Sequence, residues 1–79
     1  MKVNVLFFGV TADIVGKREI ELPLQTPIRS GEVFRQITDR YPELNEHRLL
    51  FAFNQEYSSG NEMVNDGDEL AVFNAVSGG

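Results

Sequence analysis

The sequence contains one long segment with the periodicity of an amphipathic helix, set between segments that alternate like strands. Residues 31–41 predict this helix, with Ser30 as its N-cap and Pro42 ending it, because the residue before a proline disfavours helical geometry. Its apolar stripe consists of Val33, Phe34, Ile37 and Tyr41. One helix can cover only one face of a sheet. The pattern therefore predicts an α+β fold with the helix on one side.

Strand-like segments lie on both sides of this helix. They span residues 3–8, 17–24, 48–54 and 69–73, with a very short one at 63–64. Residues 11–16 are either a turn of helix closed by a glycine or a loop, and residues 42–47 form a polar connection. We expect the first and last strands to pair in the centre of a mixed sheet. The side chains expected to point inward are Val3, Val5, Phe7, Ile20, Leu22, Phe34, Ile37, Leu49, Phe51, Leu70 and Val72.

The sheet face away from the helix is predicted to carry an apolar patch. Period-two alternation places six side chains there, with Tyr57 at the rim: Leu6, Phe8, Leu50, Ala52, Ala71 and Phe73. A contiguous exposed apolar patch usually marks a binding site, so we expect these residues to bind a partner. Two alternatives stay open. The patch can be ordinary apolar surface, or a strand slipped by one residue would move Phe8 and Phe73 into the core.

Composition narrows the functional class. The 79 residues suffice for one small domain, and 42% are hydrophobic, with six Phe and no Cys, so the core needs no disulfides. A net charge of −5 argues against a nucleic-acid partner. We find neither a signal-peptide pattern nor an apolar run of the ~20 residues that cross a bilayer, so we expect no membrane partner and a cytoplasmic location. His47, the one histidine, and the acidic turn 66–69 lack the ligand spacing of a metal site, so we expect no metal.

The sequence ends in Val76-Ser77-Gly78-Gly79. Two glycines give the thinnest backbone available, which can thread a narrow cleft and place a terminal carboxylate there. We therefore expect Gly79 to carry the chemistry and the three preceding residues to thread into a partner. The expected division is a domain of residues 1–74 and a flexible tail of residues 75–79. A frayed tail without function is the alternative.

The order of motifs resembles a known family. The segment 48–52, Arg-Leu-Leu-Phe-Ala, is similar to the third strand of ubiquitin, which implies the β-grasp fold. The chain as a whole resembles the small, sulfur-carrying subunits of molybdopterin synthase. The motifs that carry the resemblance are Val5-Leu6-Phe7-Phe8, Val15-Gly16, Phe53-Asn54-Gln55, Asn65-Asp66-Gly67-Asp68-Glu69-Leu70 and Val76-Ser77-Gly78-Gly79. Asn74-Ala75 departs from the Pro-Pro pair often found in that family. The sulfur carriers of the thiamine pathway share the fold and the Gly-Gly end.

The resemblance implies a carrier that holds no cofactor of its own. An adenylyltransferase similar to ubiquitin-activating enzymes would use ATP to adenylate Gly79, and sulfur would then convert the adenylate to a thiocarboxylate. The large subunit of a heterotetrameric synthase would receive that sulfur for a cyclic pyranopterin precursor, in molybdenum cofactor biosynthesis. Catalytic groups would belong to these partners. A thiamine-pathway carrier, a protein-conjugating modifier and a non-catalytic β-grasp adaptor that binds by its apolar face are the alternatives.

Overall fold

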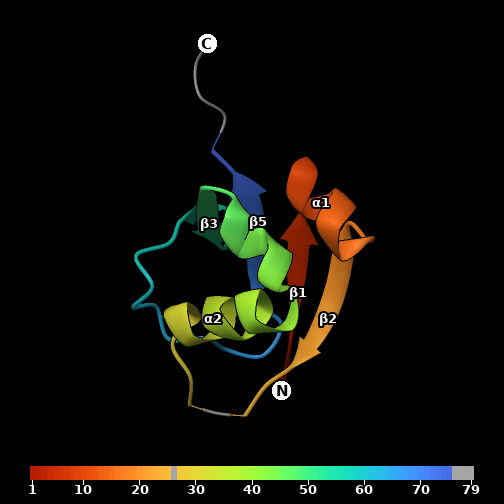
Figure 1. Ribbon diagram of the computed structural model, residues 1–79. Helices are drawn as coiled ribbons and strands as arrows, with labels where there is room; N and C mark the ends of the chain where they lie inside the picture. The colour runs from red at the N-terminus through yellow and green to blue at the C-terminus, as the bar shows by residue number, and fades with distance from the viewer. Residues whose placement is uncertain (26, 76–79) are drawn as a thin grey trace.

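A five-stranded mixed sheet forms one layer of the molecule, and the longest helix crosses one of its faces (Figure 1). The structure, a computed structural model, describes residues 1–25 and 27–75. The strands are β1 Lys2–Phe7, β2 Glu19–Pro23, β3 Leu49–Phe53, β4 Glu56–Tyr57 and β5 Glu69–Asn74. The helices are α1 Val10–Val15, α2 Ser30–Arg40 and the 3-10 helix η1 Pro42–Glu46. The α+β class predicted from the single long helix is confirmed.

The first and last strands pair at the centre of the sheet, as predicted. The strand order is β2-β1-β5-β3-β4, with β1 and β5 parallel and every other neighbouring pair antiparallel. The register sets Val5 beside Leu70 and Phe7 beside Val72, so buried side chains of both central strands point to the same side. Pro23 ends β2 at an edge of the sheet, where a residue without an N–H costs no ladder hydrogen bond.

The core lies between the sheet and α2. Its buried apolar members are Val3, Val5, Phe7, Leu22, Leu24, Val33, Phe34, Ile37, Leu44, Val64, Leu70 and Val72. Ile20, Leu49 and Phe51 pack against this core while partly buried. Phe34 of α2 stacks on Phe51 of β3 with ring centroids 4.2 Å apart. Every side chain predicted to point inward therefore lies on the helix side of the sheet, which excludes a one-residue slip.

The start of α2 differs from the sequence prediction. Ser30 is the first helical residue rather than the N-cap, and Arg29 at the cap position makes no side-chain capping bond. The loop 58–62 takes over the capping role, because the N–H groups of Ser30 and Gly31 donate to the carbonyls of Glu62 and Gly60, each at 2.9 Å. The cap is thus supplied by a segment about 30 residues away, which local sequence reading does not reveal.

The short strand is also elsewhere than expected. Met63 forms only an isolated bridge with Arg29, whereas β4 lies at Glu56–Tyr57. Asn54 and Gln55 both adopt positive φ, 49° and 71°, which forms a tight turn and brings β4 back onto β3. Asn54 favours such a turn, but the two residues of β4 are too few to show an alternating pattern in the sequence.

Two connections are more ordered than a loop. Residues 10–15 form α1, closed by Gly16 in the left-handed conformation, so the prediction of a helical turn ended by glycine is confirmed. Residues 42–46, predicted as a polar connection, form η1 instead. Pro42 begins this 3-10 helix. Leu44 is fully buried in the core, and its burial stabilises the helical turn.

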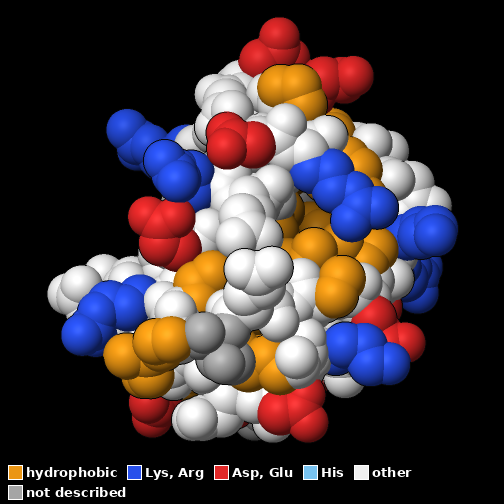
Figure 2. Space-filling view, turned by 90° about the horizontal axis from the view of Figure 1, so that it is seen from below, with side chains coloured by type: hydrophobic (Ala, Val, Ile, Leu, Met, Phe, Trp, Pro, Cys, Tyr) orange, Lys and Arg blue, Asp and Glu red, His pale blue; other side chains and the backbone are white. Residues whose placement is uncertain are grey.

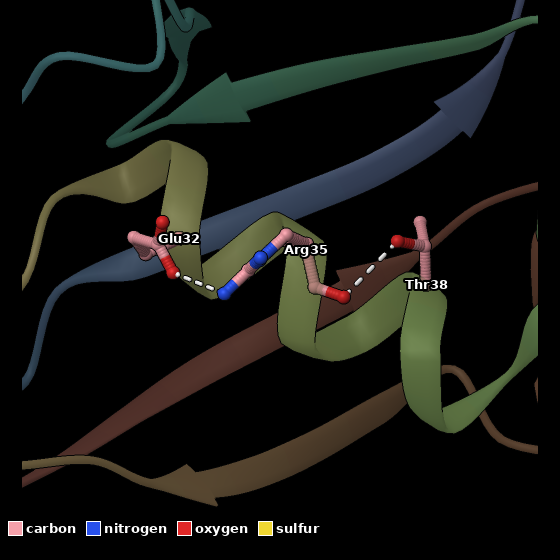
Figure 3. A network of polar contacts seen from close by, with 3 residues as sticks. All are labelled: Glu32, Arg35 and Thr38. Atoms are coloured by element: carbon pink, nitrogen blue, oxygen red, sulfur yellow. Dashed lines mark hydrogen bonds and ion pairs between the residues drawn. The ribbon is translucent and has the colours of Figure 1, made fainter.

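Charged side chains of both signs lie on the exposed face of α2 and at one end of the molecule (Figure 2). On the exposed face of α2, Arg35 pairs with Glu32 at 3.0 Å, and the Thr38 hydroxyl donates to the Arg35 carbonyl at 3.1 Å (Figure 3). The end of the molecule seen in Figure 2 likewise shows Lys and Arg side chains interleaved with Asp and Glu. In the part of the chain that the structure describes, no helix is both long and apolar enough to span a bilayer.

Candidate partner-binding face

The face of the sheet opposite α2 carries the predicted apolar patch. Antiparallel partners share a face, and β3 pairs Leu50 with Phe73 and Ala52 with both Ala71 and Tyr57. Leu6 of β1 lies beside Ala71, and Phe8 follows two residues later. The placement of all seven predicted residues on this face is confirmed. Their role in binding stays a prediction.

Six of these seven side chains line a groove of about 640 Å³. Its walls are formed by Leu6, Phe8, Ala52, Gln55, Glu56, Tyr57, Glu69, Ala71 and Phe73. Phe8 is 52% exposed and Tyr57 is 75% exposed, so two aromatic rings stand largely in solvent. The Tyr57 ring lies 6.1 Å from that of Phe73, tilted by 40°. Such exposure is costly in water, and burial of these rings by a partner would recover that free energy.

Two of the predicted residues, Ala71 and Leu50, contribute less to the exposed surface of the groove than expected. Ala71 is only 9% exposed, because it lies on the central strand between Leu6 and Ala52, and it forms the floor of the groove. Leu50 shares the face through its pairing with Phe73 but does not line the groove. The exposed part of the patch is therefore aromatic, centred on Phe8, Tyr57 and Phe73.

Sequence analysis missed the polar wall of the groove. Gln55, Glu56 and Glu69 contribute to it. Glu69 could have been found, since it precedes buried Leu70 and the alternation of β5 places it on the same face as Ala71 and Phe73. Gln55 and Glu56 join the wall because β4 folds back onto β3, and a strand of two residues carries no alternation signal.

The C-terminal end of β5 is held on both sides. The N–H of Ala75 donates to the carbonyl of Arg48 at 2.8 Å, which extends the pairing with the β3 side of the sheet. On the other side, the buried hydroxyl of Thr11 lies 2.9 Å from the Val72 carbonyl and 2.6 Å from that of Phe8. It also accepts the N–H of Phe8 at 3.0 Å. The strand that precedes the predicted tail is thus fixed to its neighbours.

The predicted reactive residue and the threading segment lie outside the described residues. Gly79, with Val76, Ser77 and Gly78, belongs to residues 76–79. The catalytic role of Gly79, the threading role of the other three and the boundary between residues 74 and 75 therefore stay predictions.

A second polar feature lies on the other side of the sheet, at the start of α2. Glu62 accepts hydrogen bonds from the Ser30 hydroxyl and, at 2.7 Å, from the Ser58 hydroxyl, and the N–H of Ser59 donates to its second oxygen at 2.9 Å. These bonds, that of Ser30 first, lower the pKa of Glu62 to about 2. The carboxylate joins loop 58–62 to α2, which identifies a structural role.

A mixed five-stranded sheet in this order, crossed by one helix on one face, defines a ubiquitin-like β-grasp protein. Sequence comparison gives the family: residues 5–79 match the ThiS family, and the chain belongs to it. Two relatives described as molybdopterin synthase sulfur carrier subunits are each 34% identical to it. The alignment with the Mycobacterium tuberculosis protein includes 100% of this chain and 99% of that protein. The alignment with the Homo sapiens protein includes 99% of this chain and 94% of that protein.

Solved structures show the same fold. A putative molybdopterin converting factor, subunit 1, from Pyrococcus furiosus superposes with a TM-score of 0.86 at 27% identity, over 96% of this chain and 99% of the other. SAMP1 from Haloferax volcanii superposes with a TM-score of 0.85 at 22% identity, over the full length of both chains. A complex of subunits 1 and 2 of the molybdopterin-converting factor from Helicobacter pylori contains a chain with a TM-score of 0.69 at 23% identity, again over both full lengths.

Proposed function

We propose that this protein is the sulfur carrier subunit of a molybdopterin synthase. One observation carries the proposal: relatives described by that activity align with the chain from end to end at 34% identity. The geometry supports it, because the described chain brings its final strand to the centre of the sheet and places an exposed aromatic groove beside that strand. The carrier would use this groove for docking and the residues after β5 for chemistry.

The proposed chemistry takes place at the carboxylate of Gly79. A carboxylate is a poor electrophile, and ATP-dependent adenylation converts it to an acyl-adenylate with release of pyrophosphate. A persulfide donor then displaces AMP, and attack by a second thiol on the resulting acyl disulfide leaves a thiocarboxylate and a donor disulfide. The soft sulfur of the thiocarboxylate is a strong nucleophile, as thiolates are. It is delivered to a cyclic pyranopterin precursor, twice per product.

Two protein partners follow from this scheme. One is the large synthase subunit, and the complex of subunits 1 and 2 from Helicobacter pylori supports such a pairing. The other is an adenylyltransferase similar to ubiquitin-activating enzymes, which supplies the ATP-binding site. Because adenylation consumes ATP, we place the reaction in the cytoplasm. The carrier itself holds no cofactor in this scheme.

The tail works as an extension of a fixed strand. The N–H of Ala75 is held by Arg48, so the threading segment Val76-Ser77-Gly78 begins at a defined point beside the docking face. A fixed origin reduces the volume that Gly79 must search inside the partner, which offsets part of the entropy lost on binding. This origin is provided by strand pairing rather than by the Pro-Pro pair of related chains.

Intact-mass spectrometry tests the proposal. Incubation with the adenylyltransferase of the same organism, ATP and a persulfide donor should give the mass change of one oxygen replaced by sulfur, located at Gly79. Addition of the large subunit and precursor should then form molybdopterin. Thiocarboxylate formation without molybdopterin would favour the thiamine-pathway alternative, whereas an unchanged mass would favour the adaptor.

A variant with one residue added after Gly79 provides the positional control. It should fold as the parent protein does yet form no thiocarboxylate, because displacement of a reacting atom by about 1 Å is already costly in a preorganised site. Removal of the added residue with a carboxypeptidase should restore the modification. Sulfur transfer by the extended, unprocessed variant would contradict the role of the Gly79 carboxylate.

A further inference from the structure

The groove on the open face has a chemical composition that a purely apolar docking site does not need. Three aromatic side chains line it, Phe8, Tyr57 and Phe73, and so do two carboxylates, Glu56 and Glu69. None of its nine lining residues is Lys or Arg. Within residues 1–25 and 27–75, neither carboxylate forms an ion pair. The groove thus combines exposed π-faces with negative charge that the described part of the chain does not neutralise.

The position of Glu69 is fixed by its backbone. Its N–H donates to the side-chain oxygen of Asn54 at 2.9 Å, and its carbonyl accepts the N–H of Asn54 at 2.8 Å. The side-chain NH2 group of Asn54 in turn donates to a carboxylate oxygen of Asp68 at 3.2 Å. Glu69 is partly buried and is the first residue of the central strand β5. Glu69 therefore lines the groove from a hydrogen-bonded strand rather than from a loop.

None of the seven Lys and Arg side chains lines the groove. Arg48, the exposed cation that precedes β3, lies at the end of that strand away from Glu69. Lys2 pairs with Glu21 at 3.8 Å on the β2 side of the sheet. Arg18 lines an adjacent hollow together with Asp13 and Glu19. A cation that fills the groove must consequently come from outside the described residues of the chain, and the overall charge of −5 favours its approach.

We propose that this groove receives an arginine side chain from the protein that docks on the open face. A guanidinium is planar and weakly hydrated, so it can stack on Tyr57 or Phe73 while donating two hydrogen bonds to a carboxylate. A lysine ammonium offers a point charge without a stacking plane. An uncharged apolar side chain would leave Glu69 desolvated without a partner. Arginine is the one side chain that satisfies both the aromatic and the acidic walls.

This inference rests on the proposed function for the identity of the partner, the large synthase subunit, but the groove can be tested without it. N-acetyl-arginine amide should shift the backbone amide resonances around Tyr57, Glu69 and Phe73 in an NMR titration. N-acetyl-citrulline amide, the neutral isostere, should shift them much less. Glu69→Gln should remove this difference, whereas Glu43→Gln, an exposed carboxylate on the helix side, should preserve it. Equal shifts from both ligands with the parent protein would overturn the proposal.

The second experiment measures binding to the large subunit. Glu69→Gln should raise the dissociation constant about tenfold or more and flatten its dependence on salt, because a buried charge-assisted contact is lost. Glu43→Gln should leave both unchanged. If the parent protein does not bind the large subunit, the proposed function is wrong. The titration with N-acetyl-arginine amide then decides by itself whether the groove binds a guanidinium. If the parent binds and Glu69→Gln behaves like Glu43→Gln, the arginine site is wrong while the proposed function stands.

Discussion

Gly31 is a helical glycine that a larger residue cannot replace. A Cβ at this position would lie 2.9 Å from the carbonyl oxygen of Gly60. The backbone of loop 58–62 cannot easily move away, because it is hydrogen-bonded to the start of α2. Glycine to alanine inside a helix ordinarily stabilises a protein by about 0.5–1 kcal/mol. We expect the opposite sign for Gly31→Ala, a loss of about 1–3 kcal/mol, because the contact with backbone forces α2 and the loop apart.

Urea unfolding of Gly31→Ala measures this loss. Gln36→Ala, an exposed substitution in the same helix, should change the free energy of unfolding by less than about 0.5 kcal/mol. A stabilised Gly31→Ala variant would mean that α2 and loop 58–62 separate freely.

Glu62 predicts a pH dependence with a definite sign. Its pKa is lowered from 4.5 to about 2 in the folded state, the hydrogen bond from Ser30 being the largest cause. A depressed folded-state pKa gives stability that is fully present above the unfolded-state pKa and is lost as the pH falls through the folded-state value. The stability advantage of the parent protein over Glu62→Gln should therefore shrink as the pH falls from about 4.5 toward 2.

The measurement is the difference in unfolding free energy between the two proteins, taken at about pH 7, 4.5 and 3. It should be largest at neutral pH and smaller at the lowest value. A constant difference would show that the Ser30 and Ser58 bonds do not discriminate between the two protonation states of Glu62.

At the scale of elements, α1 packs its apolar side chains against the core and is also hydrogen-bonded to the centre of the sheet through one buried hydroxyl. Thr11 is fully buried, and its side chain joins Phe8, the residue after β1, to Val72 of β5. Thr11→Val keeps the shape and removes every one of these bonds. The N–H of Phe8 and the carbonyl of Val72 keep their bond to each other at 3.2 Å, whereas the Phe8 carbonyl loses the bond from Thr11. We expect a loss of about 1–3 kcal/mol, because hydrogen bonds are removed at a buried site.

Thr38→Val is the matched control for this substitution. The Thr38 hydroxyl bonds only within the surface of α2 (Figure 3), so its removal should cost less than about 0.5 kcal/mol. Thermal melts and amide exchange at Phe8 should separate the two variants. Equal losses would show that the Thr11 bonds contribute no more than surface ones.

Elements governed by local periodicity were predictable, and those governed by distant contacts were not. Alternation in β1 and β5 and the apolar stripe of α2 fixed both the fold class and the two faces, because burial on one side of a sheet enforces strand register. The cap of α2 could not be predicted, since Glu62 and Gly60 supply it across the chain. The turn at Asn54 and Gln55 has a sequence signal, since Asn adopts positive φ more readily than most residues, but the two residues of β4 are too few to show alternation.

At the scale of the whole molecule, the candidate site was predictable in position but not in chemistry. Period two placed Phe8 and Phe73 on the open face without any knowledge of the partner. The acidic wall was missed because charged side chains at strand ends are ordinarily solvated, although the alternation of β5 places Glu69 on the same face as Phe73. The two faces of the sheet thus differ: α2 covers one face (Figure 1), and the other exposes the groove that we propose as the docking site.

That separation predicts opposite effects for neighbouring phenylalanines. Phe8→Ala and Phe73→Ala should weaken binding to the large subunit by about 2 kcal/mol or more each, because exposed aromatic side chains at an interface centre act as anchors. They should cost folding less than the ~3–5 kcal/mol of a buried ring. Phe7→Ala is the control: Phe7 is 2% exposed on the helix side of the same strand, so its loss should fall on stability.

Titration calorimetry against the large subunit, paired with urea unfolding, gives both free energies for each variant. The two open-face variants should lose mainly affinity, and Phe7→Ala should lose mainly stability while its folded fraction still binds. The dissociation rate should rise for the open-face variants, since apolar anchors act after encounter. Added salt should slow association, because it screens the attraction between the acidic surface and the partner. Unchanged affinity of Phe8→Ala and Phe73→Ala would mean that the partner docks on another face.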